Sequence, residues 1–332
     1  MQKGLAKILG GAAFSLAMSL VPFFGASALT VSPPYFDYRL NPGDTNLDVI
    51  KLYNDSSQSL TIWPQLQNFT ADDKESGTPV FYSPDQDQKG SSLAQWIKVD
   101  QTPIVLAPQE RANLPFAINV PKDRVQPGGH FGAIMLSTQP PNATGGVAIG
   151  SQIAALILVN ISGDVKEVGG IAEFGFNKPA SWYNYLPVDF FLRFENSGNT
   201  HLRPVGNVFI KDVFGRQVAA LVLNPDFRSV LPQSIRRFEL GWHGRGGAEP
   251  GNFLDGLNYE WHNFGLGKYK ATLVVNYGSN NSVVTDEREF YVWPWRLLSV
   301  GGVLLVLLLT LLKLGGKAWR KSIIREYEKS KG

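Results

Sequence analysis

The chain has 332 residues, of which 18% are charged, with a formal net charge of +3 and no cysteine. The absence of cysteine excludes thiol catalysis, disulfide exchange and thiolate metal sites. The net positive charge lies at the two ends of the chain, which leaves the stretch 29–292 mildly acidic. Because binding to nucleic acid needs clustered positive charge, this composition predicts no nucleic-acid partner.

The first 28 residues have the three parts of a secretory signal peptide. Lys3 and Lys7 form a basic start, an apolar stretch follows, and Ala26-Ser27-Ala28 is a small-residue cleavage site. We therefore expect residues 1–28 to be removed, so that the mature chain begins near Leu29. The alternative is an uncleaved N-terminal anchor.

Residues 29–292 form short runs of alternating apolar and polar residues, separated by clusters of Pro, Gly, Asn and Asp. A period of two is typical of strands with one buried face. Three inward faces are predicted: Leu114, Phe116, Ile118 and Val120; Val188, Phe190, Leu192 and Phe194; and Tyr269, Ala271, Leu273, Val275 and Tyr277. The run Ile153–Val159 is apolar on both faces, which predicts a central strand.

The length of this region predicts an all-β fold of two immunoglobulin-like β-sandwiches in tandem. We place them at 29–168 and 169–292, with the boundary near Gly169-Gly170, where a new alternation begins. Two stretches lack a strand pattern, a polar insertion at 72–95 in the first sandwich and a loop at 244–267 in the second. Long loops on a rigid scaffold are where binding usually occurs.

Residues 293–314 predict a single transmembrane helix. The uncharged run between Arg296 and Lys313 is long enough for a hydrocarbon core of about 30 Å. The residues predicted to anchor it are Trp293, Trp295, Lys313, Lys317, Arg320 and Lys321. The basic flank predicts a cytoplasmic tail at 315–332 on the anionic inner leaflet, and an extracytoplasmic 29–292.

The sequence offers little catalytic chemistry. It contains no nucleophile elbow, P-loop, H-E-x-x-H pair or dinucleotide fingerprint in a suitable context. The histidines lack metal-ligand spacing, although two of them flank one loop: they are His130, His201, His243 and His262. Asp85-x-Asp87 imitates a calcium loop, but Lys89 stands where an oxygen ligand belongs. We predict no catalytic residue, no metal and no cofactor.

Aromatic residues are the candidate contacts with a partner. Five lie in predicted loops or at strand ends: Tyr82, Trp182, Tyr183, Tyr259 and Trp261. Exposed rings stack on sugars or fill pockets of a partner protein, and packing in a core is the alternative for each. Trp96, in contrast, is predicted to anchor a core.

Several short motifs follow one another along the first predicted sandwich. They are Tyr35-Phe36-Asp37 before Pro42-Gly43, Asn54 closing a strand, Leu106-x-Pro108-x-Glu110, Pro121, and Pro127-Gly128-Gly129 before a strand. With these features, residues 29–165 resemble the N-terminal domain of the WxL-interacting proteins of Gram-positive bacteria. The resemblance implies that the first domain engages peptidoglycan and the second a surface protein. It also makes Gly128, Gly129 and His130 a candidate contact surface, with a tight turn as the alternative.

These observations together predict a non-enzymatic, membrane-anchored cell-envelope protein that binds peptidoglycan, a surface protein, or both. Two alternatives remain open. One is a pilus- or secretion-type chaperone that completes the sheet of another subunit by strand addition. The other is an envelope hydrolase whose carboxylates meet only in the fold.

Overall fold

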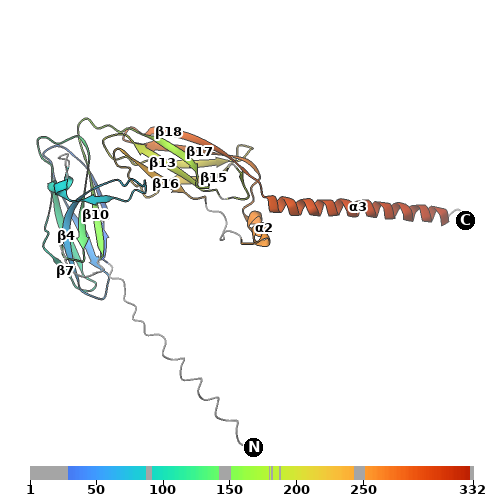
Figure 1. Cartoon of the computed structure of the whole chain (residues 1–332), viewed down its shortest axis with the longest axis horizontal. Coiled ribbons are helices and arrows are strands. Elements are labelled where there is room, and N and C mark those ends of the chain that lie inside the picture. Colours follow the sequence, from blue (N-terminus) through green and yellow to red (C-terminus); the bar gives the residue numbers. More distant parts are fainter. Residues whose placement is uncertain are drawn as a thin grey trace, which may run out of the picture.

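The computed structural model describes residues 29–86, 92–141, 151–178, 180, 182–186, 188–242 and 251–329. These residues form four β-sheets arranged as two sandwiches, followed by a long helix (Figure 1). The first sandwich lies steeply inclined across one end of the second, and the helix leaves from the other end (Figure 1).

The first sandwich packs a four-stranded sheet against a six-stranded one. The first of these has the order β1 (Leu29–Ser32), β3 (Thr45–Asn54), β8 (Arg111–Asn119), β6 (Ile97–Val99). The second has the order β2 (Tyr35–Leu40), β10 (Gln152–Ile161), β9 (Gly128–Ser137), β4 (Leu60–Thr70), β5 (Val80–Tyr82), with β7 (Ile104–Leu106) also paired to β4. Two short helices, η1 (Pro84–Gln86) and α1 (Leu93–Trp96), lie between β5 and β6. This is an immunoglobulin-like strand order, in which the first strand is divided between the two sheets.

The second sandwich also has two sheets. One has the order β11 (Gly169–Phe176), β13 (Phe190–Asn196), β16 (Ser234–Leu240). The other has the order β12 (Trp182–Tyr183), β18 (Ser282–Val292), β17 (Gly267–Tyr277), β14 (Val205–Lys211), β15 (Gln217–Leu223). Helix α2 (Phe253–His262) precedes β17, and α3 (Trp295–Lys329) follows β18.

Each sandwich encloses its own hydrophobic core. Trp96 belongs to the first core, as predicted. The alternating residues of 114–120, 188–194 and 269–275 are all buried, and Tyr277 packs against the second core while partly exposed. The alternation was informative because each of these strands has one face on a core. The predicted all-β fold, with β-sandwiches followed by an apolar helix, is confirmed.

The helices depart from the sequence analysis in three places. The insertion predicted at 72–95 contains η1 and most of α1, as well as β5. α2 lies inside the stretch 244–267, which was predicted to be a loop. It buries only Gly256 and Glu260, so no apolar stripe faces a core and the usual signal of a core-facing helix is missing. α3 begins at Trp295 and continues to Lys329, through the residues predicted as a separate basic tail.

Candidate functional site

Ion pairs hold the two sandwiches together at their junction. Glu75, after β4, accepts two hydrogen bonds from Arg193 of β13, from Nε at 2.7 Å and from Nη2 at 2.5 Å. The hydrogen-bonded guanidinium holds the pKa of Glu75 below its ordinary value. Asp37 of β2 contacts Arg203 and His201. Burial opposes the ionisation of Asp37, but the hydrogen bond from His201 and the nearby cations outweigh it and lower its pKa. Both carboxylates therefore support the junction when they are ionised.

The N-terminal half of β10 is paired with a neighbouring strand on one side only. β10 pairs with β9 along its whole length, but with β2 only from Leu156 onward. Pro33 and Pro34 precede β2, and neither has an N–H to donate to a ladder. Before them the chain belongs to the opposite sheet, as β1. Among the described residues, Gln152–Ala155 therefore present an uncovered strand edge.

The backbone groups at this edge can be assigned. The N–H of Leu156 donates to the carbonyl of Pro34 at 3.0 Å, so Leu156 directs its backbone groups toward β2. Successive residues of a strand direct these groups to alternate sides. Gln152 and Ala154 therefore direct their N–H and C=O groups to the uncovered side. An unpaired row of this kind is what an added strand uses.

The outer face of the six-stranded sheet is also apolar. It carries a second cluster, separate from the core and called here the outer apolar cluster: Phe69, Ala133, Met135 and Leu158. Leu231 of the second sandwich packs against it, so the cluster reaches across the junction. Ala154 and Leu156 also pack against it, which extends the cluster to the uncovered edge of β10.

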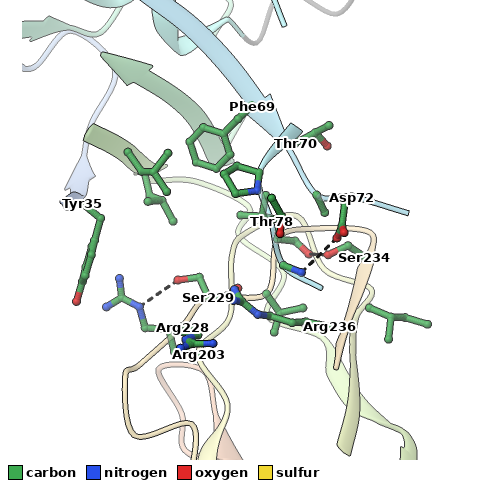
Figure 2. A pocket seen from close by; sticks show the side chains of 18 of the residues that line it. Tyr35, Phe69, Thr70, Asp72, Thr78, Arg203, Arg228, Ser229, Ser234 and Arg236 are labelled. Carbon is green, nitrogen blue, oxygen red and sulfur yellow. Dashed lines mark hydrogen bonds between the residues drawn. The ribbon is translucent and has the colours of Figure 1, made fainter. Parts of the chain in front are cut away.

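A cavity of about 260 Å³, called here the junction pocket, lies where the outer apolar cluster meets the second sandwich (Figure 2). Figure 2 shows Phe69 on one wall and Arg203, Arg228 and Arg236 on the opposite wall. Tyr35 stands at one side of it. The pocket therefore combines apolar side chains with three arginines of the second sandwich, and the carboxylates Asp72 and Asp226 also line it.

The three arginines differ in their partners. Arg203 pairs with a carboxylate of β2, and Arg228 pairs with Asp226 at 2.7 Å. Arg236 donates to the carbonyl of Ser229 at 2.8 Å, and none of the carboxylates in the described part of the chain forms an ion pair with it. Burial lowers the pKa of Arg236 and the charge of Arg228 adds to this effect, while the charge of Asp72 in the same pocket opposes it. Because a guanidinium stays protonated in proteins, Arg236 offers a partly desolvated positive charge to an anionic group.

The predicted contact residues Gly128, Gly129 and His130 lie inside the junction. Gly128 has a φ of +111°, and a Cβ there would lie 2.3 Å from the carbonyl oxygen of Asn199. The N–H of Gly129 donates to that same oxygen at 2.8 Å. His130 is 3% exposed, and its ring lies 4.5 Å from that of Trp96. These three residues thus contact other parts of this chain.

The structure separates the five predicted aromatic contacts. Tyr82 lies in β5 of the first sandwich, while the other four lie at the end of the second sandwich nearest α3. Trp182 stacks on Tyr291 with ring centres 4.8 Å apart, and the Tyr183 hydroxyl donates to the carbonyl of Lys178. Tyr259 packs edge-on against a neighbouring tyrosine, whereas Trp261 is 70% exposed.

The remaining predicted features concern metals and the membrane. No group of three or more His, Asp or Glu side chains that could hold a metal occurs in the described ranges. His201 lies at the junction and His262 on α2, while His243 and Asp87 fall outside the described residues. The stretch Trp295–Lys321 is long and apolar enough to cross a membrane, and its residues are exposed from Gly301 onward. Trp293 and Trp295 flank its start, while Lys313, Lys317, Arg320 and Lys321 lie in its last turns.

Sequence reasoning did not single out Arg236 or the uncovered half of β10. The adjacent Arg236 and Arg237 within a strand were a usable signal, because neighbouring residues point to opposite faces. Arg237 pairs with Glu239 beside it, which leaves Arg236 on the face toward the pocket. The run at 153–159 is apolar on both faces of its strand. It was a second usable signal, because the face away from the core then needs an apolar contact of its own.

No protein-family model and no curated protein matches the chain, so the resemblance to the WxL-interacting proteins stays a prediction. Solved structures of fimbrial chaperones do match. The E. coli chaperone DraB is 11% identical, over 80% of this chain and 97% of its own, with a TM-score of 0.34. The class 5 fimbriae chaperone CfaA is 11% identical, over 79% and 99%, with a TM-score of 0.36. The Salmonella enterica SafA pilin in complex with the SafB chaperone gives 9% identity, over 80% and 97%, with a TM-score of 0.33.

The predicted cell-wall-binding or scaffolding module is corrected by these comparisons, because solved structures that each match about four-fifths of the chain are fimbrial chaperones. The geometry gives a physical reason for the error. The Pro-Gly-Gly segment that suggested a wall contact is used within the chain, where Asn199 of the second sandwich covers it.

Proposed function

We propose that this protein is a membrane-anchored, extracytoplasmic chaperone that binds an extended segment of a partner protein by strand addition to β10. The uncovered edge at Gln152–Ala155 is the single observation on which the proposal rests. An edge with unpaired N–H and C=O groups recruits another strand, and most proteins cover or shorten such edges. Here the edge adjoins an apolar surface and a pocket, which favours a binding role.

The bound segment would pair with β10 along the uncovered edge and then cross the outer apolar cluster toward the junction pocket, because β2 occupies the edge from Leu156 onward. Its backbone would pair with Gln152 and Ala154, where β2 no longer covers the edge. The distance from Gln152 to Leu158 corresponds to about 20 Å of extended chain, at roughly 3.3 Å per residue. Apolar side chains on alternate residues of the segment would pack on the outer apolar cluster, which supplies specificity for a β-forming sequence.

The basic wall of the junction pocket adds a preference for negative charge. Arg236 projects into the pocket and has a carbonyl rather than a carboxylate as its partner. A carboxylate of the bound segment would form a charge-assisted hydrogen bond with this guanidinium. We therefore infer a partner whose extended segment is apolar at alternate positions and bears a carboxylate at one end.

Two of the similar solved structures are complexes of a chaperone with a pilin and with a tip adhesin. The pilin and the tip adhesin are the partners of those chaperones and are not assigned to this chain. For this chain we propose the class of partner, a protein with an exposed apolar strand, from the edge and the pocket alone. Strand addition requires no bond to be broken, so we also propose that the protein is not an enzyme.

We propose further that α3 crosses the membrane once, with residues 29–292 outside and the basic end inside. Tryptophans precede the apolar run and lysines and arginines follow it, which is the arrangement expected at an outer and an inner interface. The binding edge would then lie beyond the second sandwich, away from the bilayer, because α3 leaves from the opposite end of that sandwich (Figure 1).

The strand-addition proposal can be tested at Ala154. In Ala154→Pro the N–H that faces the uncovered side is absent, while the bonds to β9 are made by the neighbouring residues. The matched control, Ala154→Ser, keeps the N–H and a small side chain. Full-length protein in detergent would be titrated with fluorescent twelve-residue peptides of alternating Val and Thr, and binding measured by anisotropy.

We expect the wild type and Ala154→Ser to bind these peptides and Ala154→Pro to lose binding, with all three showing the same melting temperature. Equal binding by the proline variant would mean that the peptides do not pair with this edge. That result would reject strand addition at β10.

A further inference from the structure

Helix α2 is amphipathic, and its apolar side is the exposed one. At about 100° per residue, one side of the helix carries Phe253, Leu254, Leu257 and Trp261, called here the apolar face of α2. The opposite side carries Asp255 and His262. Leu254 is 72% exposed and Trp261 is 70% exposed. A helix that packed onto a core would bury these residues instead.

α2 is fixed to the first turn of α3 by a buried carboxylate. Glu260 is 0% exposed and accepts hydrogen bonds from Arg296 Nη1 at 3.1 Å and from the N–H of Leu297 at 3.0 Å. Gly256 permits this close approach, since a Cβ there would lie 2.5 Å from Arg296 Nε. Figure 1 shows α2 beside the start of α3.

This contact sets the depth of α2 in relation to α3. Leu297 is the first residue of the uncharged run of α3, and Glu260 bonds directly to its backbone. Any membrane that receives α3 must begin within about one helical turn, 5.4 Å, of this residue. α2 is therefore held at the level where α3 enters the bilayer.

Other exposed apolar side chains surround the same point. They are Phe264, Leu266, Trp293 and Trp295. The rings of Phe253 and Trp295 lie 5.9 Å apart, which joins the apolar face of α2 to the start of α3. Tryptophan and other aromatic side chains are favoured at the boundary between headgroups and acyl chains.

We propose that the apolar face of α2 lies in the outer interface of the membrane that α3 crosses, as an in-plane amphipathic helix bound to the glycerol and acyl-chain region of the lipids. The proposal rests on the membrane anchor of the proposed function, and it adds a second lipid contact outside the spanning segment. Such helices bury their apolar face about 5–10 Å deep, with the polar face in water. Two contacts at an angle to each other would fix the tilt of the second sandwich on the bilayer, and so the direction in which the junction pocket is presented.

Continuity with α3 favours lipid over a protein as the occupant of this face. The apolar face carries no charged side chain, and its residues adjoin a helix whose own apolar surface is fully exposed in the absence of lipid. A protein partner bound there would need to compete with the bilayer that begins at Leu297.

The chain contains no cysteine, so single cysteines would report one position each. We would spin-label Leu254→Cys on the apolar face, Asp255→Cys on the polar side of the same helix, and Leu307→Cys in the middle of α3. The full chain would be reconstituted in vesicles of phosphatidylcholine and phosphatidylglycerol. Collision rates would be measured with oxygen, which concentrates in lipid, and with a water-soluble nickel chelate.

We expect the ratio of oxygen to nickel collisions at Leu254 to exceed that at Asp255 severalfold and to approach that at Leu307. Equal nickel access at Leu254 and Asp255, with Leu307 in lipid, would overturn the interfacial helix while leaving the anchor intact. A label at Leu254 that neither reagent reaches would also overturn it, because protein would then cover the face. Nickel access at Leu307 would reject the anchor, and the interfacial helix with it.

Discussion

Two regions of the molecule expose apolar side chains, the junction of the sandwiches and the start of α3, and they differ in their backbones. At the junction, the outer apolar cluster adjoins a strand edge with uncovered N–H and C=O groups. At α3, the apolar face of α2 belongs to a helix whose backbone groups are largely bonded within it. Lipid offers no hydrogen bonds to a backbone, so it can cover only the second kind of surface. An added strand satisfies the first kind.

The two regions also differ in charge. The junction pocket has a basic wall in which Arg236 is available to an anion, whereas the apolar face of α2 is uncharged and its nearest cation, Arg296, is already bonded to Glu260. We therefore expect changes at the junction to alter peptide binding without altering membrane contact. Changes at α2 should alter membrane contact without altering peptide binding.

The largest effect is expected from Glu260→Ala. This change leaves the guanidinium of Arg296, only 18% exposed, without its carboxylate. Removing one member of a buried pair costs about 3–5 kcal/mol, more than a helix of this length can recover by itself. We expect α2 to separate from α3, with hydrogen exchange rising over α2 and unchanged in the β-strands.

A suitable control is Glu289→Ala, which breaks the exposed pair between β17 and β18 that Glu289 forms with Lys268. Exposed pairs contribute little because water and salt screen them, so exchange in α2 should stay as in the wild type. Unchanged exchange over α2 in Glu260→Ala would contradict the account of the buried contact. Weakened peptide binding in that variant would break the separation of the two regions.

A smaller effect is expected from Arg236→Met, which keeps the length of the side chain and removes its charge. A hydrogen bond to a charged group contributes about 1.5–3 kcal/mol, so a peptide with a free C-terminal carboxylate should bind at least roughly tenfold more weakly. The amidated form of the same peptide should bind as it does to the wild type. Anisotropy titrations of both peptides would measure the difference.

The control for that experiment is Arg228→Met, because Arg228 already pairs with Asp226. It should affect the two peptides alike. An equal loss for both peptides in Arg236→Met would show that Arg236 supports the shape of the pocket and not the recognition of a carboxylate.

The strands could be predicted from the sequence where one face meets a core. Phe190, Leu192 and Phe194 alternate with exposed or partly exposed residues for this reason, apart from Phe191, which packs under Arg237. The same reasoning failed for α2, whose apolar side faces away from the protein. Its pattern is helical, but a stretch without neighbours in a core gives no second signal that separates a helix from a loop.

The candidate site could be predicted only in part, because it depends on contacts between distant segments. The doubly apolar run of β10 correctly indicated a central strand for the half that β2 covers. Where the cover ends depends on Pro33 and Pro34, far earlier in the chain. Likewise, the sequence marked Gly128 as special, but only Asn199, in the other sandwich, shows that it serves a close backbone contact.

The smallest expected effect is a pH dependence confined to the junction. The pKa values of Glu75 and Asp37 are lowered in the folded protein from ordinary values of 4.5 and 3.8. A carboxyl group with a lowered folded pKa contributes stability that is fully present above its unfolded pKa and is lost as the pH falls through the folded one. The junction should therefore be at full strength above about pH 5 and weaken progressively below about pH 4.

Because the Glu75 pair is partly exposed, we expect Glu75→Gln to lower the free energy of unfolding by only about 1 kcal/mol at neutral pH. That difference should shrink as the pH falls, since the wild-type carboxylate becomes neutral too. Urea titrations of the full chain in detergent, at a series of pH values, would measure it. A difference that grows toward low pH would contradict the assignment, and a matching pH change in lipid contact at Leu254 would show that the two regions are coupled.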